Sequence, residues 1–268
     1  MLTESTYIFS FSNKCAMQHN RIESGVQLFS RVNRKTYLEG INSALFPNGG
    51  PHHNQVIEIT GAPEIDKYDL IIDFIVRCIL PNKYNNEWKG SAAILINTDF
   101  QISLLKIIKV IETKIAKHDI KESKRLIIEN ALKNLIIFNC YTLEQLEMTF
   151  YYLENVIQSN ANICLVAIDN ISTGFWISSM NSGTSNYSHS LRNFEILYNV
   201  IKSLEVLTIF LKHDKTTKKR FSSKVDFRIE IEKIEDNYKA IVTSYENQSV
   251  VHIPFHLKAD IEFLQQIS

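Results

Sequence analysis

The chain has 268 residues, 45% of them hydrophobic, and its 29 Lys and Arg residues balance its 29 Asp and Glu residues. A chain of this length and composition can bury a large core, and we expect one globular domain without a disordered tail. Because the net charge is zero, no overall electrostatic field draws the chain to nucleic acid or to an anionic membrane, so any DNA contact must come from a local patch.

The cysteines and the N-terminus point to a soluble, intracellular protein. The four cysteines are scattered and show no C-x-x-C spacing, which argues against a zinc site and against the disulfide framework of a secreted protein. The first six residues contain neither a basic region nor a sustained apolar run, so no signal peptide is predicted. The most apolar helix candidate, residues 70–80, is too short to span a bilayer.

The first segment with helical spacing precedes the main core. Within residues 21–32, apolar side chains recur at the spacing of one helix face, which predicts a short helix. A loop rich in proline and glycine follows it. We therefore divide the chain into an N-terminal helix and linker, residues 1–50, and a core, residues 51–268, whose C-terminal strands begin at about residue 225.

From residue 56 onward, apolar strand-like segments alternate with helix-like segments. The predicted strands are residues 56–60, 92–96, 135–138, 163–168 and 206–211. The predicted helices are residues 67–80, 102–116, 122–132, 143–157 and 191–204. Because the strands are apolar along their whole length, we expect a parallel sheet with helices on both faces.

The last part of the chain has a different pattern. Residues 225–231, 238–244 and 250–255 are strand-like and are separated by short polar connections, a spacing typical of antiparallel strands. We expect them to extend the sheet at one edge. The predicted fold class is therefore α/β, a mostly parallel central sheet with helices on both faces and an antiparallel C-terminal extension.

The segment after the first predicted strand has the outline of a phosphate-binding loop. The complete pattern, G-x-x-x-x-G-K-S/T, wraps phosphates in backbone N–H groups, brings a lysine to the outer phosphates and holds magnesium through a hydroxyl. Gly61 and Lys67 stand at the right separation. However, Asp66 replaces the second glycine and Tyr68 replaces the hydroxyl residue. The alternative is that Asp66 only caps the following helix and that Lys67 is a solvated residue of its first turn.

Polar side chains also follow the other predicted strands. Ligands of open parallel sheets bind at the carboxyl ends of the strands, and Asp99, Asp169 and His213 each follow a different strand. Asp169 ends an apolar run, as does the carboxylate that orients magnesium in nucleotide sites, although it could instead cap a turn. Asp99 could position an attacking water and His213 could sense a γ-phosphate, and either could instead be a solvent-exposed residue.

A basic loop follows the strand at residues 206–211. Residues 212–221 contain five Lys or Arg residues and end on an aromatic residue, a combination that could hold phosphates and stack a base. The candidate DNA-binding residues are Lys215, Lys218, Lys219 and Arg220. A charge run of this kind can also be a solvated loop, and its three consecutive basic residues could serve as a nuclear address.

Taken together, several short motifs resemble the RecA-like recombinases and, more narrowly, their DNA repair paralogues. The motifs are Arg21-x-Glu23-Ser24-Gly25, Leu45-Phe46, Arg77-Cys78-Ile79-Leu80-Pro81, Thr98-Asp99, Leu165-Val166-Ala167-Ile168-Asp169-Asn170-Ile171-Ser172, Phe175-Trp176-Ile177 and Asn181-x-Gly183. Each motif is short, and the resemblance rests on their joint order and spacing, which match from about residue 20 to about residue 215.

The resemblance implies a RecA-like P-loop NTPase core that lacks the separate N-terminal DNA-binding domain of full recombinases. It also implies a nuclear role in homologous recombination. Such paralogues join other RecA-like recombinase paralogues in a hetero-oligomer, which binds single-stranded or branched DNA and helps the recombinase filament to assemble.

The resemblance also implies roles for individual residues. Gly61 and Lys67 correspond to the glycine and lysine of the nucleotide loop, and Asp169 corresponds to the carboxylate that orients magnesium. Asp99 corresponds to the catalytic carboxylate, and His213 lies near the position of the phosphate-sensing residue. Residues 180–188 and 215–224 correspond to the first and second DNA loops of the family.

This chain departs from the family pattern at Asp66, Tyr68 and His213. Hydrolysis requires positioned phosphates, metal and water together, so we expect at most a weak DNA-dependent ATPase, and binding of ATP and magnesium is itself in doubt. One hypothesis is a non-catalytic subunit that acts through protein contacts and shared DNA binding. The other is a DNA-stimulated ATPase whose site a neighbouring subunit completes. A P-loop-derived kinase or transferase is disfavoured because no acceptor-binding motif is present.

Overall fold

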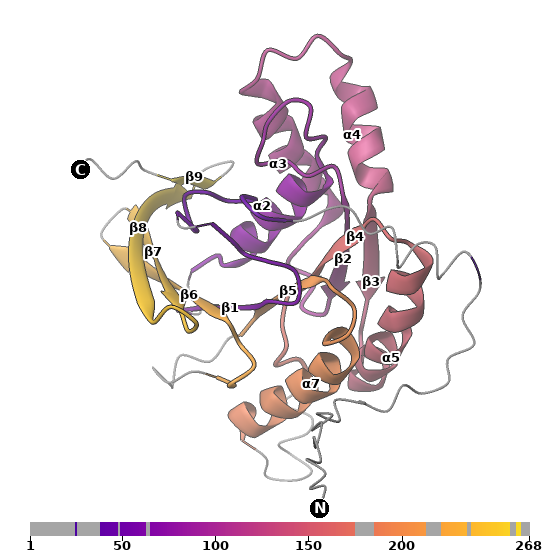
Figure 1. Cartoon of the computed structure of the whole chain (residues 1–268), viewed down its shortest axis with the longest axis vertical. Helices are drawn as coiled ribbons and strands as arrows, with labels where there is room; N and C mark the ends of the chain where they lie inside the picture. Colours follow the sequence, from indigo (N-terminus) through magenta and orange to yellow (C-terminus); the bar gives the residue numbers. More distant parts are fainter. Residues whose placement is uncertain are drawn as a thin grey trace, which may run out of the picture.

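The computed structural model describes residues 25, 38–47, 49–62, 65–174, 185–212, 221–234, 237–257 and 261–263. Within these residues, nine strands form one sheet in the order β3-β2-β4-β5-β1-β6-β7-β8-β9 (Figure 1). The strands are β1 (Val56–Gly61), β2 (Ala92–Asn97), β3 (Leu135–Asn139), β4 (Ile163–Ile168), β5 (Leu207–Leu211), β6 (Phe227–Ile234), β7 (Asn237–Ser244), β8 (Ser249–Leu257) and β9 (Ile261–Phe263). The helices are α2 (Tyr68–Ile79), α3 (Leu104–Ala116), α4 (Lys124–Lys133), α5 (Leu143–Ser159) and α7 (Asn186–Ile201).

The strand directions confirm the predicted fold class. From β3 to β6 every neighbouring pair is parallel, and from β6 to β9 every pair is antiparallel. The first of the three predicted C-terminal strands therefore has two roles, because β6 pairs in parallel with β1 and starts the antiparallel extension. The predicted helix at residues 21–32 lies outside the described residues, apart from Gly25.

The sheet separates two apolar cores. Successive strand side chains point to opposite faces, so Ile57 and Ile59 of β1 lie in a core with α2, α3 and α4, whereas Val56 lies in a core with α5 and α7. Figure 1 shows these two groups of helices on opposite sides of the sheet. Strands β1, β2, β4 and β5 are buried along their whole length, which is why their sequences are largely apolar. The exceptions inside β1 and β5 are Glu58, Thr60 and Thr208, which are buried as well.

The start of α7 differs from the prediction. The helix was expected from residue 191 and begins at Asn186, where the side chain of Ser185 accepts a hydrogen bond from the backbone N–H of Ser188 at 3.2 Å. Its first turn is polar, so no apolar periodicity reveals it, and the capping serine supplies the start signal instead.

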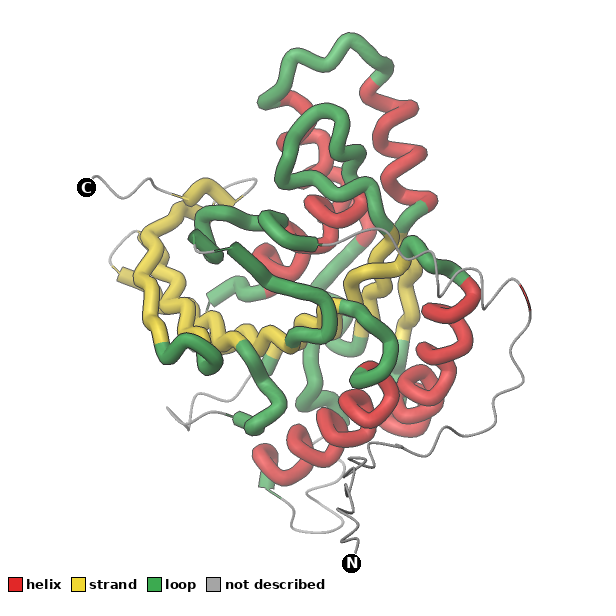
Figure 2. Tube along the Cα trace, viewed as in Figure 1, coloured by secondary structure: helices red, strands yellow, loops and turns green. Residues whose placement is uncertain are grey.

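The C-terminal strands curve back toward α2 (Figure 2). Ile261 of β9 is 4% exposed and belongs to the same core as Phe74 and Ile75 of α2. The antiparallel extension therefore covers part of α2 as well as widening the sheet. None of the described helices is long and apolar enough to cross a membrane.

A buried group of charges fastens α2 to its neighbours. Asp73 of α2 is 1% exposed, and its carboxylate lies 2.7 Å from Nε of Arg77 and 2.6 Å from Nζ of Lys114 on α3. Asn42, from the loop before β1, donates to it at 3.1 Å, and Arg77 also pairs with Glu87. Burial alone would raise the pKa of Asp73, but the two cations hold it below its ordinary value. The ionised network therefore stabilises the fold at neutral pH and is lost as the pH falls through that lowered pKa.

We expect Arg77→Met to lower the free energy of unfolding by about 3 kcal/mol, the low end of the range for breaking a buried ion pair, because Lys114 still faces Asp73. The matched control is Arg125→Met. Arg125 also pairs with a carboxylate four residues away, Glu129, but both side chains are exposed, so a change below about 0.5 kcal/mol is expected. Urea-induced unfolding at neutral pH measures both, and equal losses would contradict a special role for the buried network.

Candidate functional site

Four neighbouring strands end at the same rim of the sheet. Strands β2, β4, β5 and β1 are consecutive and parallel, so the segments after their carboxyl ends meet there. Lys67 follows β1, Asp99 follows β2, Asp169 follows β4 and Lys212 follows β5. The predicted convergence of strand ends is therefore present.

The loop between β1 and α2 keeps the glycine and the lysine of a phosphate-binding loop. A side chain at Gly61 would place its Cβ 2.8 Å from the carbonyl oxygen of Ile231, so glycine is needed for the close approach of β6. Lys67 is 1% exposed, and its Nζ donates to the carbonyl oxygen of Ala62 at 2.6 Å and to that of Ile65 at 3.4 Å. The alternative that Lys67 is a solvated residue is wrong, because its amine lies inside the loop.

Asp66 occupies the amino end of α2. Its Oδ1 accepts a hydrogen bond from the backbone N–H of Tyr68 at 3.2 Å, and its Oδ2 lies 2.8 Å from Nζ of Lys106 on α3. Lys106 also lies 2.9 Å from Asp69. Partial burial would lower the pKa of Lys106, but the two carboxylates raise it. Asp66 thus accepts a hydrogen bond from the first turn of α2, as expected if it caps that helix. The ammonium group of Lys106 on α3 holds the carboxylate in this position.

Asp169 ties the ends of β2 and β4 together. It is fully buried, and its Oδ1 accepts hydrogen bonds from the backbone N–H of Thr98 at 2.7 Å and from the Thr98 hydroxyl at 2.8 Å. The N–H of Asp99 lies 3.3 Å from the same carboxylate. Burial raises the pKa of Asp169 to about 6, although the hydrogen bonds from Thr98 act in the opposite direction. A magnesium-orienting role for Asp169 stays a prediction.

The hydroxyl of Tyr68 reaches across the rim to Asp99. It donates to Oδ2 of Asp99 at 3.1 Å, and the same oxygen accepts a hydrogen bond from Nδ2 of Asn170 at 2.8 Å. Burial, followed by the charge of Asp99, raises the pKa of the Tyr68 phenol well above its ordinary value, so the phenol is protonated and donates at neutral pH. The carboxylate predicted to position a water molecule is therefore engaged by two neighbouring side chains.

These contacts do not fit a bound nucleoside triphosphate with magnesium. A phosphate at the amino end of α2 would meet the carboxylate of Asp66, which repels it, and the N–H group of Tyr68 is already bonded to that carboxylate. Tyr68 directs its hydroxyl at Asp99 and not at the loop. The rim residues mainly hold the strand ends to one another.

Lys212 turns inward at the end of β5. It is 1% exposed, and its Nζ lies 4.7 Å from the ring centroid of Phe221 and 5.5 Å from that of Tyr187, within the range of cation–π attraction. The first residue of the predicted basic loop is therefore part of the core. The other predicted residues of this loop lie outside the described residues, namely His213, Lys215, Lys218, Lys219 and Arg220. Residues 180–184 of the first DNA-loop range also lie outside the described residues.

Sequence reasoning missed two residues that shape the rim, namely Lys106 and Tyr187. Lys106 stands 40 positions from Asp66 in the chain, and no local pattern relates them. Asn170, which directly follows Asp169 at a strand end, was predicted at this rim, and its contact with Asp99 was not. Tyr187 lies in the polar first turn of α7, which gave no helical periodicity.

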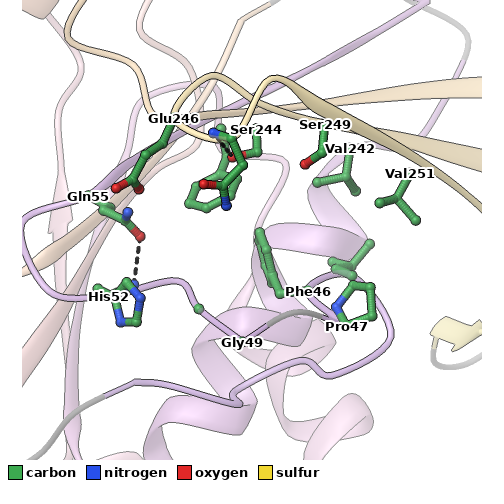
Figure 3. A pocket seen from close by; sticks show the side chains of 14 residues that line it. Phe46, Pro47, Gly49, His52, Gln55, Val242, Ser244, Glu246, Ser249 and Val251 are labelled. Atoms are coloured by element: carbon green, nitrogen blue, oxygen red, sulfur yellow. Dashed lines mark hydrogen bonds between the residues drawn. The ribbon is translucent and has the colours of Figure 1, made fainter.

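Cavities also occur away from this rim. One of about 90 Å³ lies between the loop before β1 and strands β6 to β8, at the opposite end of β1 from Lys67, and Phe46, His52 and Glu246 line it (Figure 3). Another, of about 130 Å³, lies beside Arg77 between α2 and α3. Neither contains a residue that the sequence predicted as part of a site.

No family model matches the chain. The DNA repair protein XRCC2 of Mus musculus is 26% identical to it over 166 residues, which make up 62% of this chain and 57% of that protein. The chain thus resembles XRCC2, in agreement with the order of the motifs, and its mostly parallel sheet with antiparallel C-terminal strands is consistent with a RecA-like core. The match spans little more than half the length of this relative.

Ionisation of Asp169 is expected to destabilise the fold. Its folded pKa of about 6 lies above the ordinary value of 3.8, so the stability it contributes is present below the ordinary value and is lost as the pH rises through about 6. The difference of about two pKa units corresponds to about 3 kcal/mol.

Asp169→Asn tests this expectation, because asparagine keeps an oxygen acceptor for Thr98 and does not ionise. Between about pH 4 and about pH 7, the unfolding free energy of the parent chain should fall relative to that of the variant. Urea-induced unfolding at several pH values measures both, and parallel profiles would contradict the prediction.

Proposed function

We propose that this chain works in DNA repair by homologous recombination, as a non-catalytic or weakly catalytic RecA-like subunit of a hetero-oligomeric complex in the nucleus. In this complex it binds other RecA-like recombinase paralogues and, together with them, single-stranded or branched DNA. Its role is to help the recombinase filament to assemble. The similarity to the DNA repair protein XRCC2 supports a role in DNA repair.

The observation that carries the proposal is that the rim residues engage one another. Asp66, Tyr68 and Asp99 are bound by groups of the same chain, at the positions where a RecA-like NTPase holds phosphate, metal and water. Catalysis needs these three to be positioned together. A RecA-like core with such a rim is better suited to binding partners on its surface than to hydrolysing a nucleotide.

A surface suited to a protein partner lies where the sheet ends at β3. Among the described strands, β3 is the last one on that side, and an edge strand offers backbone N–H and C=O groups to another chain. Large apolar side chains are exposed beside it, on α5 and after β2 and β3. These residues, which we refer to as the β3–α5 surface, are Phe100, Tyr141, Met148, Tyr151 and Tyr152.

Aromatic contacts occur in the β3–α5 surface both at the strand ends and on the helix. Phe100 and Tyr141 are 41% and 71% exposed, and their rings are stacked with centroids 4.6 Å apart. Tyr152 of α5 packs edge-on against Phe138 of β3, with centroids 6.3 Å apart. Several large apolar side chains exposed beside one edge strand favour an interaction site there. We assign it to a RecA-like paralogue partner.

The DNA contact is proposed at Lys215, Lys218, Lys219 and Arg220. Because the chain carries no net charge, attraction to the phosphate backbone has to come from such a local group of cations. Each phosphate neutralised adds to the salt dependence of binding, so weak affinity that falls steeply with salt is the expected signature.

A second candidate function is a DNA-stimulated ATPase whose site a neighbouring subunit completes. The retained geometry of Gly61 and Lys67 favours it, because the strand, the tight approach of β6 and the buried lysine are still in place. In this case a partner would have to draw Asp66 away from the amino end of α2.

Calorimetric titration of magnesium-ATP into the purified chain separates the two candidates. We expect no binding to the parent chain or to Lys67→Ala at micromolar nucleotide. We expect the double variant Asp66→Gly, Tyr68→Thr to gain binding, because it restores the glycine and the hydroxyl of the loop and releases the first-turn N–H group. Binding to the parent chain that Lys67→Ala abolishes would refute the non-catalytic proposal.

Lys106→Met is the matched control for this gain of binding. It removes the cation that holds Asp66 but leaves the carboxylate at the amino end of α2, where it still repels phosphate. The control should therefore gain no binding. A gain equal to that of the double variant would mean that the position of the loop, and not the charge of Asp66, excludes nucleotide.

The partner surface is tested by the double variant Met148→Ser, Tyr151→Ser. When the chain is co-expressed with RecA-like recombinase paralogues, we expect this variant to bind its partner at least about tenfold more weakly, because two central apolar contacts are lost. Its unfolding free energy should change by less than about 0.5 kcal/mol, since both side chains are on the surface.

The matched control is Ile234→Ser, Val250→Ser, which removes exposed apolar side chains from the C-terminal strands and should leave the complex intact. Size-exclusion chromatography and affinity measurement on the co-expressed proteins give the readout. Unchanged binding by the Met148, Tyr151 variant would place the partner elsewhere on the chain.

A further inference from the structure

The cavity of about 130 Å³ between α2 and α3 is lined mainly by hydrogen-bond donors and cations. The polar residues around it are Arg77, Asn85, Glu87, Lys114, Lys117 and His118. A space of this size accommodates several water molecules, and hence also a small oxyanion. The cavity is separate from the phosphate-binding loop, because Arg77 lies in the last turn of α2, about 15 Å along the helix from Lys67.

Arg77 brings N–H donors to this cavity that its other contacts do not use. Its side chain lies in the core at 8% exposure, where Nε faces Asp73 at 2.7 Å and Nη1 binds Glu87. Among the described residues, Nη2 has no hydrogen-bond partner. A guanidinium group carries donors on all three nitrogens, and a donor in the core is costly when it stays unpaired. An acceptor in the cavity would satisfy it.

His118 offers a second donor, and the contacts of Asn85 define its tautomer. Oδ1 of Asn85 accepts a hydrogen bond from the backbone N–H of Glu87 at 2.8 Å, which fixes the orientation of the amide. Nδ2 of Asn85 therefore donates to Nε2 of His118, 3.3 Å away. A neutral imidazole that accepts at Nε2 carries its proton on Nδ1, so His118 keeps an N–H group for a ligand. Its ring packs edge-on against Trp88, with centroids 4.9 Å apart.

The charges at the cavity favour an anion over a neutral acceptor. The cations that line it are Arg77, Lys114 and Lys117, and the carboxylates of Asp73 and Glu87 lie beside them. Both oxygens of Glu87 are engaged, one by the backbone and hydroxyl of Ser43 and the other by Arg77. An oxyanion would supply negative charge and acceptor oxygens together, and such charge-assisted hydrogen bonds are the strong ones.

We propose that this cavity binds a small oxyanion of the phosphate class, with Arg77 and His118 as its donors and Lys117 as a further cation. Trp88 and Ile261 form apolar walls of the cavity and are 2% and 4% exposed, so water is kept from part of the site and the hydrogen bonds there are strengthened. The ligand would join α2, α3 and the segment before β2. A ligand that binds only the folded chain stabilises it by mass action.

Calorimetric titration of sodium phosphate into the purified chain tests the site, with sodium chloride used to keep the ionic strength constant. We expect saturable binding with a Kd of about 1 mM or below. The unfolding temperature of the chain should rise with phosphate concentration over the same range. The absence of saturable binding up to about 20 mM phosphate would overturn the proposal.

Lys117→Gln and His118→Gln locate the site, because neither side chain is buried in the core and both variants should fold. Each should weaken phosphate binding at least about fivefold. The matched control is Lys109→Gln, which removes an exposed lysine from the same helix but outside the cavity and should change the affinity less than about twofold. Equal losses in Lys117→Gln and Lys109→Gln would show a general charge effect and would overturn the site.

Arg77→Lys tests the direct donor. Lysine keeps a cation near Asp73 but lacks the planar fork that provides Nη2, so phosphate binding should weaken at least about tenfold. Urea-induced unfolding checks that this variant is folded. Lys67→Ala separates the cavity from the phosphate-binding loop: it should leave phosphate binding unchanged, and loss of binding in Lys67→Ala with retention in Lys117→Gln would overturn the proposal.

Titration of glycerol phosphate under the same conditions distinguishes two sources of the oxyanion. Binding as tight as that of inorganic phosphate, and weakened by Lys117→Gln, would assign the site to a phosphate monoester group of a larger ligand. Exclusion of glycerol phosphate would assign it to the free ion. Both results support an oxyanion site, and neither depends on the function proposed for the chain in DNA repair.

Discussion

The carboxylate of Asp169 is the constraint on which the rim of the sheet depends. It is fully buried at the end of β4 and binds the backbone and hydroxyl of Thr98 at the end of β2. Through Asp99 and Tyr68 the same set of hydrogen bonds continues to the first turn of α2. Three elements that are far apart in the sequence are thus held in one arrangement, at the cost of a charge that burial disfavours.

Two of the buried carboxylates, Asp73 and Asp169, have opposite electrostatic surroundings. Asp73 faces Arg77 and Lys114, which overcome the effect of burial on its pKa, whereas Asp169 has hydrogen-bond donors but lies near the like charge of Asp99. Asp73 therefore favours the folded chain when ionised, and Asp169 favours it when protonated. The first serves packing between helices, and the second lies at the rim, where a RecA-like core would place its ligand.

Most of the fold could be predicted from the sequence, because the central strands are largely apolar, the C-terminal strands are strand-like with short polar connections, and most helices show a periodic apolar face. The start of α7 at Asn186 could not, since its first turn is polar and is defined by a cap. At the site, the strand-end positions of Asp99 and Asp169 were predictable from the order of strands. The burial of Lys67 was not, because its partners are loop carbonyl groups. The contact between Lys106 and Asp66 was not either, because it depends on tertiary packing.

The return of β9 to α2 has a consequence for synthesis of the chain. Ile261 shares a core with Phe74, so part of the apolar face of α2 stays uncovered until β9 has left the ribosome. At about 5–20 residues per second, the roughly 180 residues between them take on the order of 10–40 s to be made. During that time the nascent chain presents an apolar helix face and the open edge of a growing sheet. Transiently exposed surfaces of this kind are prone to aggregation and are the surfaces that chaperones protect.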